Sequence, residues 1–200
     1  MKVGVIDIGT LKVKFLVGNL GFREEFQTIY QSNTLTRLGV RMHLNNNRPF
    51  PRYLSQTIKE LKRCKKIVKK EKIEKIRVVS THALREMGEK GWEIAEQIRK
   101  EVGFNVEIIS QDAEAELFFN AVIKDFKTDR DFAVVDVGGG SVQIVIGNKK
   151  KMKNKYLLKT GPTYLFDKFK LSREATDFST FNEIKTLQKY IAKETEVLPA

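Results

Sequence analysis

The sequence predicts an α/β protein with two lobes, and three observations support this prediction. Segments with strand-like apolar patterns alternate, over residues 54–125, with segments that have the apolar period of helices. Two segments, "KVGVIDIGTLKVKFLVGN" near the N-terminus and "AVVDVGGGSVQIVIGN" further along, share the order strand, Asp, Gly, strand. Their aspartates, Asp7 and Asp136, are 129 residues apart, which is about one domain length.

The first half supplies the elements of one lobe. Residues 2–9 and 12–19 are predicted to be paired strands joined by a Gly-Thr turn, and shorter β-like pieces continue over residues 24–41. Further elements then alternate: a helix around Leu54, Ile58, Leu61 and Val68, a strand at 75–81, a helix over 82–102 with a possible glycine break, a strand at 104–110 and a helix over 112–126.

The second half repeats only part of this pattern. After residues 127–130 the strand–Asp–Gly–strand unit returns, and one or two helical segments follow it, at 163–171 and 181–198. We therefore assign residues 1–125 to a first lobe and residues 126–200 to the start of a second lobe. The second lobe is expected to be short or truncated.

Composition indicates a globular protein. Of 200 residues, 41% are hydrophobic and 31% are charged, which differs from disordered and membrane proteins. Cys64 is the only cysteine, so an internal disulfide is excluded. We expect neither a signal peptide nor a membrane-spanning segment, and the cytoplasm is the predicted location.

Basic residues are abundant and unevenly distributed. The net charge is +12, residues 52–77 contain eleven Lys or Arg against three Glu, and residues 149–155 contain five lysines. The electrostatic field of this positive charge attracts polyanions without selecting one of them. The simpler interpretation of the basic residues is a solvated helix face and a hairpin tip. No aromatic residues interleave with these lysines, so we do not expect a nucleic-acid surface.

The aspartates require an explanation, because a charge at a buried strand is unfavourable unless it faces a polar cleft. Glycines after each aspartate allow a tight turn without side chains, and backbone N–H groups there can bind phosphate oxygens. Two such turns could hold a phosphate chain with hydrated Mg²⁺ between them. An ordinary hairpin with a satisfied aspartate is the alternative. Dinucleotide and Walker motifs need a helix after their glycines, whereas "SVQIVIGN" predicts a strand.

These residues carry a resemblance to a known family. "VIDIGT" and "VVDVGGGS" resemble the two phosphate loops of the actin, sugar-kinase and heat-shock-chaperone superfamily. "VVSTHALRE", "VEIISQDAEAEL", "RLG" at Arg37–Gly39 and Gly161 before "PTYLFDKF" resemble segments of the exopolyphosphatase and guanosine pentaphosphate phosphohydrolase (Ppx/GppA) family. The resemblance runs in order from Val3 to about Phe169 and implies a two-lobe, ribonuclease H-like, actin-like ATPase fold.

The resemblance also implies roles for particular residues in releasing a terminal phosphate by attack of water. Glu114 matches the catalytic glutamate, and a position near a helix N-terminus favours its ionised form. Asp7 and Asp136 match the aspartates that position Mg²⁺. Thr81, at a predicted helix start, could add N–H donors. The remaining implied phosphate-binding residues are Gly9, Thr10, Arg85, Gly138, Gly139, Gly140 and Ser141.

Several positions depart from the family pattern and leave alternatives open. Leu11, two residues after Gly9, stands where the family has asparagine, Glu116 replaces an arginine, and Gln143 replaces an acidic residue. A phosphohydrolase acting on polyphosphate or guanosine pentaphosphate is the first hypothesis, and the basic surface favours polyphosphate. A non-catalytic binding relative is the second, and an ATP-dependent kinase or ATPase is the third. Oligomeric state is left open, a homodimer included.

Overall fold

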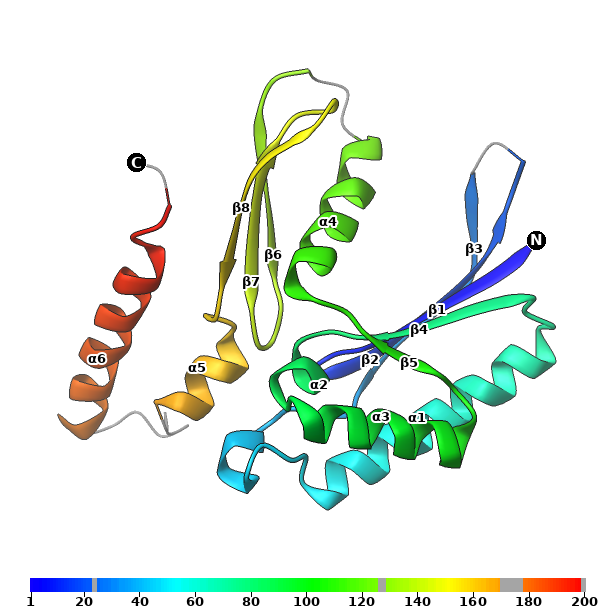
Figure 1. The fold of residues 1–200 in the computed structure, drawn as a ribbon, viewed down its shortest axis with the longest axis horizontal. Helices are drawn as coiled ribbons and strands as arrows, with labels where there is room; N and C mark the ends of the chain where they lie inside the picture. The colour runs from blue at the N-terminus through cyan, green and yellow to red at the C-terminus, as the bar shows by residue number, and fades with distance from the viewer. Residues whose placement is uncertain (23–24, 126–128, 170–177, 199–200) are drawn as a thin grey trace. The chain divides into compact units, whose positions relative to one another are not determined.

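The computed structural model describes residues 1–22, 25–125, 129–169 and 178–198, which contain both strands and helices (Figure 1). The chain divides into two compact units, Met1–Ile109 and Ser110–Ala200. Each unit is built around its own sheet, so the predicted α/β class is confirmed.

The first unit contains a five-stranded sheet of β1 (Lys2–Ile8), β2 (Lys12–Leu20), β3 (Phe26–Leu35), β4 (Lys75–Ser80) and β5 (Val106–Ile108). The strand order is β3-β2-β1-β4-β5. Strands β1 to β3 are antiparallel, whereas β4 is parallel to β1 and β5 is parallel to β4. The predicted shorter pieces after residue 24 are a single ten-residue strand, β3.

Three helices pack on one face of this sheet: α1 (Pro51–Lys70), α2 (His82–Glu86) and α3 (Glu89–Val102) (Figure 1). Ile6 and Ile8 of β1 are fully buried on that face, whereas Val5, the residue before Ile6, is 42% exposed. Leu61 of α1 and Ile98 of α3 are fully buried in the same core. Each such side chain contributes about 1.5–3 kcal/mol by leaving water, so this layer holds β1 in place.

Gly88 separates α2 from α3. Its φ is +61°, a left-handed conformation that glycine adopts without steric penalty, and it precedes the first residue of α3. The predicted glycine break in this helical stretch is confirmed. A short 3-10 helix, η1 (Met42–Asn45), lies between β3 and α1.

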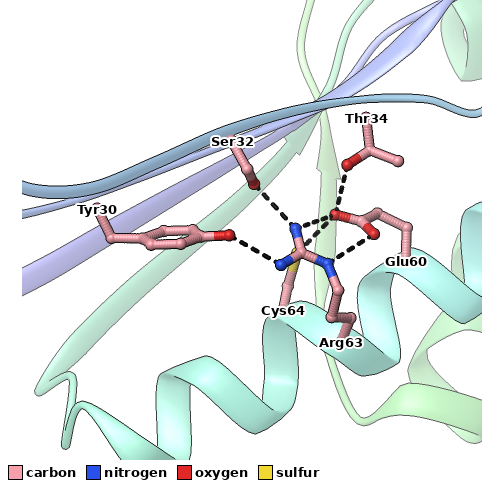
Figure 2. Close-up of polar contacts among 6 residues, drawn as sticks. All are labelled: Tyr30, Ser32, Thr34, Glu60, Arg63 and Cys64. Atoms are coloured by element: carbon pink, nitrogen blue, oxygen red, sulfur yellow. Dashed lines mark hydrogen bonds and ion pairs between the residues drawn. The ribbon is translucent and has the colours of Figure 1, made fainter.

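A polar cluster fastens the end of β3 to α1 (Figure 2). Glu60 of α1 is only 7% exposed, and it accepts hydrogen bonds from Thr34 of β3 and from Arg63, the latter through both carboxylate oxygens. Arg63 also donates to Tyr30 and Ser32 of β3. Burial raises the pKa of Glu60, but the hydrogen bonds from Arg63 and Thr34 outweigh this effect and leave the pKa lowered. The cluster therefore fixes the residues that follow β3.

The second unit contains an antiparallel sheet, β6 (Phe132–Val137), β7 (Val142–Gly147) and β8 (Met152–Leu158), in that order. Helix α4 (Gln111–Val122) packs on this sheet through Ala115 and Phe119. A short 3-10 helix, η2 (Ile123–Asp125), follows it directly. Helices α5 (Pro162–Lys168) and α6 (Phe178–Thr195) follow. The predicted hairpin tip at residues 149–155 is in part strand, because β8 begins at Met152.

Helix α4 belongs by its packing to the second unit. The sequence-based division at residues 125 and 126 placed this helix in the first lobe, whereas its contacts are with β6, β7 and β8. Residues 126–128, at that predicted boundary, lie outside the described residues. The assignment of lobes remains a prediction.

Candidate phosphate-binding site

The turn between β1 and β2, which we call turn 1 (residues 9–12), has the geometry of a tight hairpin. The N–H of Gly9 donates a hydrogen bond of 2.9 Å to the carbonyl oxygen of Lys12. Asp7, near the end of β1, lies opposite Lys14 of β2, and the Lys14 ammonium is 3.5 Å from its carboxylate. The carboxylate of Asp7 therefore lies beside the ammonium group of Lys14, next to turn 1.

Turn 2 (residues 138–141), between β6 and β7, repeats this geometry. The N–H of Gly138 donates 2.9 Å to the carbonyl oxygen of Ser141, and Asp136 lies opposite Gln143. Because Gly9 and Gly138 use their N–H groups to close the turns, these groups are not available to a ligand. Among the described residues, the N–H groups of Thr10, Leu11, Gly139 and Gly140 make no backbone hydrogen bond and could bind phosphate oxygens.

The first glycine of each turn is explained by the lack of room for a side chain, not by its backbone conformation. A Cβ on Gly9 would lie 3.2 Å from the Lys12 carbonyl oxygen, and one on Gly138 would lie 3.1 Å from that of Ser141. Neither glycine has a positive φ. A side chain at either position would therefore press on the oxygen that closes the turn.

Turn 1 is supported by the segment after β3. The N–H groups of Thr36 and Arg37 donate to the Leu11 carbonyl oxygen at 3.0 and 2.9 Å, and that of Gly39 donates to Thr10 at 3.0 Å. Thr10 and Thr36 are 6% and 1% exposed, and neither hydroxyl has a hydrogen-bond partner in the described structure. Two buried hydroxyls without partners are unusual and indicate a place where a polar ligand could bind.

Turn 2 is supported by α5. The N–H groups of Thr163 and Tyr164 donate to the Gly139 carbonyl oxygen at 2.8 and 3.2 Å. A Cβ on Gly161 would lie 2.4 Å from the carbonyl carbon of Gly140, so the backbones touch at this point. Glycine is required at position 161 by this close approach, which fixes the shape of turn 2.

Glu114 lies in the first turns of α4, as predicted. Ser110 caps the helix by accepting a hydrogen bond of 3.1 Å from the N–H of Ala113. Phe119, near the other end of α4, stacks on Phe132 at the start of β6, so the helix runs antiparallel to β6. The start of α4 and turn 2 therefore lie at the same end of the second unit (Figure 1).

Asp112 and Glu116 on the same helix face β8. The ammonium of Lys155 is 2.5 Å from Asp112 and 3.4 Å from Glu116, and these contacts raise the pKa of Lys155. The negative charge of Glu116 is thus compensated by Lys155. This ion pair was not predicted from the sequence.

Thr81 and Arg85 lie beside turn 1 in the first unit. Ser80 pairs with Ile8 across parallel strands and donates its hydroxyl hydrogen to the Ile8 carbonyl oxygen at 2.9 Å. Thr81 follows directly and is the N-cap of α2. Arg85 donates a hydrogen bond of 2.9 Å to the Ile109 carbonyl oxygen. The carboxyl ends of β1 and β4 thus bring both predicted residues to the edge that carries turn 1.

The predicted site residues form two sets, one in each unit. The first unit contains Asp7, Gly9, Thr10, Thr81 and Arg85. The second unit contains Glu114 and Asp136, with residues 138–141 of turn 2. The binding of one phosphate chain by both sets remains a prediction.

The oxygen groups near Asp136 bear on the predicted Mg²⁺ site. Gln143, opposite Asp136, is 1% exposed and donates from Nε2 to the Ser141 hydroxyl at 3.2 Å, while its Oε1 has no hydrogen-bond partner in the described structure. No group of three or more His, Cys, Asp or Glu side chains among the described residues could hold a metal ion. The available oxygens suit Mg²⁺, which proteins often bind through one or two carboxylates, water and substrate phosphates.

A separate cavity of about 1130 Å³ lies beside the end of β3 and the lysine-rich face of α1. Lys59, Lys62, Arg63 and Lys66 line it, but none of the predicted site residues does. Arg63 is already paired with Glu60, and Lys62 is 3.6 Å from Glu101. This cavity is therefore not the predicted phosphate site.

The chain shares its α/β fold with solved structures of Ppx/GppA proteins, so the predicted ribonuclease H-like, actin-like ATPase fold class is confirmed. The model of the Ppx/GppA phosphatase family matches residues 18–199 of the chain. The chain therefore belongs to the Ppx/GppA phosphatase family. A solved structure of the Aquifex aeolicus PPX-GPPA enzyme is similar, with a TM-score of 0.78 and 28% identity, and the similarity covers 100% of this chain and 64% of that one.

Two curated relatives give a consistent picture. The bifunctional 3-dehydroquinate synthase/phosphatase of Fusobacterium nucleatum is 31% identical over 194 residues, covering 90% of this chain and 28% of that protein. Exopolyphosphatase 2 of Mycobacterium tuberculosis is 25% identical, covering 98% of this chain and 62% of that protein. The chain thus spans less than two thirds of the length of these relatives.

Proposed function

We propose that the protein is a phosphohydrolase that releases the terminal phosphate of inorganic polyphosphate or guanosine pentaphosphate by Mg²⁺-assisted attack of water. The single observation that supports this most is the repetition of one acidic glycine turn in both units, with the same closing hydrogen bond of 2.9 Å. Family membership makes a phosphatase the expected class, and the exopolyphosphatase relative suggests the substrate.

Glu114 is proposed as the general base. The Ser110 cap fixes the start of α4, and the helix dipole there stabilises an ionised carboxylate by about 0.3–1 kcal/mol. An ionised Glu114 could orient the attacking water and accept its proton. The free N–H groups of the two turns, with Arg85, would bind the phosphate oxygens on which charge develops. Bound Mg²⁺, held by Asp7 and Asp136 through water, would neutralise part of that charge.

Inorganic polyphosphate is the preferred substrate. The basic residues of α1 include Lys59 and Lys66, which make no ion pair among the described residues, and these charges would raise the local concentration of a long polyanion. Among the residues that the structure describes, no helix is long and apolar enough to cross a membrane. We expect the protein to act in the cytoplasm.

The second candidate function is that of a non-catalytic sensor or binding module for the same ligands. Gln143 supports it, because this buried amide stands where the family has an acidic residue that could bind a cation. Such a protein would bind polyphosphate and Mg²⁺ without releasing phosphate.

Phosphate release from polyphosphate with Mg²⁺ distinguishes the two. We expect Glu114→Gln to lower the rate about 10²–10⁴-fold, the usual contribution of a general base. Glu116→Gln is the matched control, since it removes the same charge two residues away and should leave the rate within a few-fold. Binding of polyphosphate without release by the unmodified protein would instead establish the binding module.

A further inference from the structure

Arg37 adopts a backbone conformation that arginine rarely adopts. Its φ is +61°, in the left-handed region, where residues other than glycine and asparagine pay about 1–2 kcal/mol. It lies in the segment that connects β3 to η1. Strain of this kind persists when the surrounding structure enforces it, and it is often found at functional sites.

Hydrogen bonds to turn 1 hold Arg37 in this strained conformation. The N–H groups of Arg37 and of its neighbour Thr36 both donate to the Leu11 carbonyl oxygen, at 2.9 and 3.0 Å. Gly39, two residues later, donates to Thr10. The Glu60 cluster of Figure 2 holds the preceding end of β3 on α1. Arg37 is thus fixed next to a turn that is proposed to bind phosphate.

The side chain of Arg37 has no structural task in the described part of the molecule. It is exposed and makes no hydrogen bond or ion pair with any described residue. By contrast, Arg63, Arg77 and Arg99 each form an ion pair with a glutamate. No contact of the Arg37 guanidinium within the described residues therefore explains why arginine stands at this strained position.

A second observation points to a ligand at the same place. Thr10 belongs to turn 1, and Thr36 belongs to the segment after β3 that donates hydrogen bonds to it. Both hydroxyls are more than nine-tenths buried and have no hydrogen-bond partner in the described structure. Hydroxyl groups are common donors to phosphate oxygens, and a guanidinium binds phosphate through two parallel hydrogen bonds.

We propose that Arg37 is a further phosphate-binding residue, which contacts the phosphate chain held at turn 1. The inference rests on the proposed function and extends its site by one cation. The N–H groups of turn 1 are neutral and Asp7 is negatively charged, so these groups do not neutralise a phosphate chain. Arg37 adds a positive charge there, and its role is in binding rather than in the attack of water.

The test is Arg37→Gly, which removes the guanidinium and relieves the strain together. We expect the midpoint of thermal unfolding to rise, because glycine tolerates a positive φ. We expect the affinity for Mg²⁺-tripolyphosphate, measured by calorimetry in the Glu114→Gln protein so that the ligand is not consumed, to fall about tenfold or more. A stabilised protein that binds less tightly is not expected from a purely structural role.

Lys72→Gly is the matched control. Lys72 also has a positive φ, +51°, and is exposed, but it lies in the turn after α1, where the neighbouring Glu71 contacts Lys2 at the start of β1. Turn 1 lies at the other end of β1, about 20 Å away. This variant loses the same charge and the same strain, so its midpoint should also rise while its tripolyphosphate affinity stays unchanged.

The outcomes separate the two proposals. Equal affinities of Arg37→Gly and Lys72→Gly for tripolyphosphate would overturn the role of Arg37 and leave the proposed function intact. Absence of tripolyphosphate binding by the unmodified protein would refute the proposed function, and the role of Arg37 with it. An intermediate affinity of Arg37→Lys would support recognition by the guanidinium rather than by charge alone.

Discussion

The two hairpins of the molecule have the same turn but different supports. Gly9 and Gly138 close their turns with equal hydrogen bonds of 2.9 Å. Turn 1 is held by the chain after β3, which donates to Thr10 and Leu11, whereas turn 2 is held by the start of α5, which donates to Gly139. The turn itself is thus encoded in a few adjacent residues, and its rigidity is supplied by distant ones.

The sheets behind the turns also differ. Strand β1 lies at the centre of five strands, while β6 is an edge strand of three. Val135 and Val137 of β6 are 52% and 65% exposed, so this strand is less buried than β1. Turn 2 therefore depends more on its helical support than turn 1 does on the segment after β3.

The largest effect is expected where turn 2 meets α5. Gly161→Ala would place a Cβ 2.4 Å from backbone, and backbone cannot move aside as a flexible side chain can. We expect a loss of about 3 kcal/mol in the free energy of unfolding and a fall in phosphate release of more than tenfold. Gly21→Ala is the control, because its nearest heavy atom would lie at 3.5 Å. Unchanged stability of Gly161→Ala would show that α5 does not support turn 2.

A smaller, pH-dependent effect is expected at the support of turn 1. Glu60→Gln should cost about 1–2 kcal/mol at neutral pH by removing a charged acceptor from Arg63 and Thr34. The pKa of Glu60 is lowered from its ordinary value of 4.5, so its contribution is fully present above that pH and is lost as pH falls through the lowered value.

Denaturant unfolding between pH 7 and pH 3 measures this effect. The difference between the unmodified protein and Glu60→Gln should shrink below about pH 4.5. Amide exchange should accelerate at Thr36 and Arg37 in acid, with no such change at Thr163 and Tyr164. A difference that grows on acidification would contradict the assigned ion pair.

The smallest effect is expected at Lys14. This residue faces Asp7 in the position that Gln143 occupies opposite Asp136. Lys14→Gln makes the first hairpin resemble the second and removes an exposed ion pair, so stability should change by less than about 1 kcal/mol. Mg²⁺ affinity in the presence of tripolyphosphate should rise, since an ammonium 3.5 Å from the carboxylate opposes a cation there. A weaker Mg²⁺ affinity would show that Lys14 itself binds the phosphate.

The comparison also shows what a single sequence can predict. The two turns, the helix that carries Glu114 and the break at Gly88 follow from local patterns, and the structure contains them. Strand β8 was missed because its lysines and asparagine have low strand propensity, and pairing with β7 overrides that preference. The Lys155 ion pairs were missed for the same reason, since they depend on that pairing.

The supports of the turns could not be predicted, because they join residues far apart in the chain. Nothing local to Arg37 indicates that its N–H binds Leu11, and nothing local to Gly161 indicates the contact with Gly140. The motif quoted around Arg37 marked the position. The structure adds that Arg37 has a strained backbone and that its N–H donates to turn 1.

The proposed function requires that Asp7 and Asp136 serve one Mg²⁺-phosphate ligand, and a double-mutant cycle tests this requirement most directly. Calorimetry would measure Mg²⁺-tripolyphosphate binding to Asp7→Asn, Asp136→Asn and the double variant, all in the Glu114→Gln protein so that the ligand is not consumed. If the two carboxylates share a ligand, each single change should weaken binding about tenfold or more, and the double change should weaken it little further. Effects that multiply, or a single variant that binds normally, would contradict a shared site.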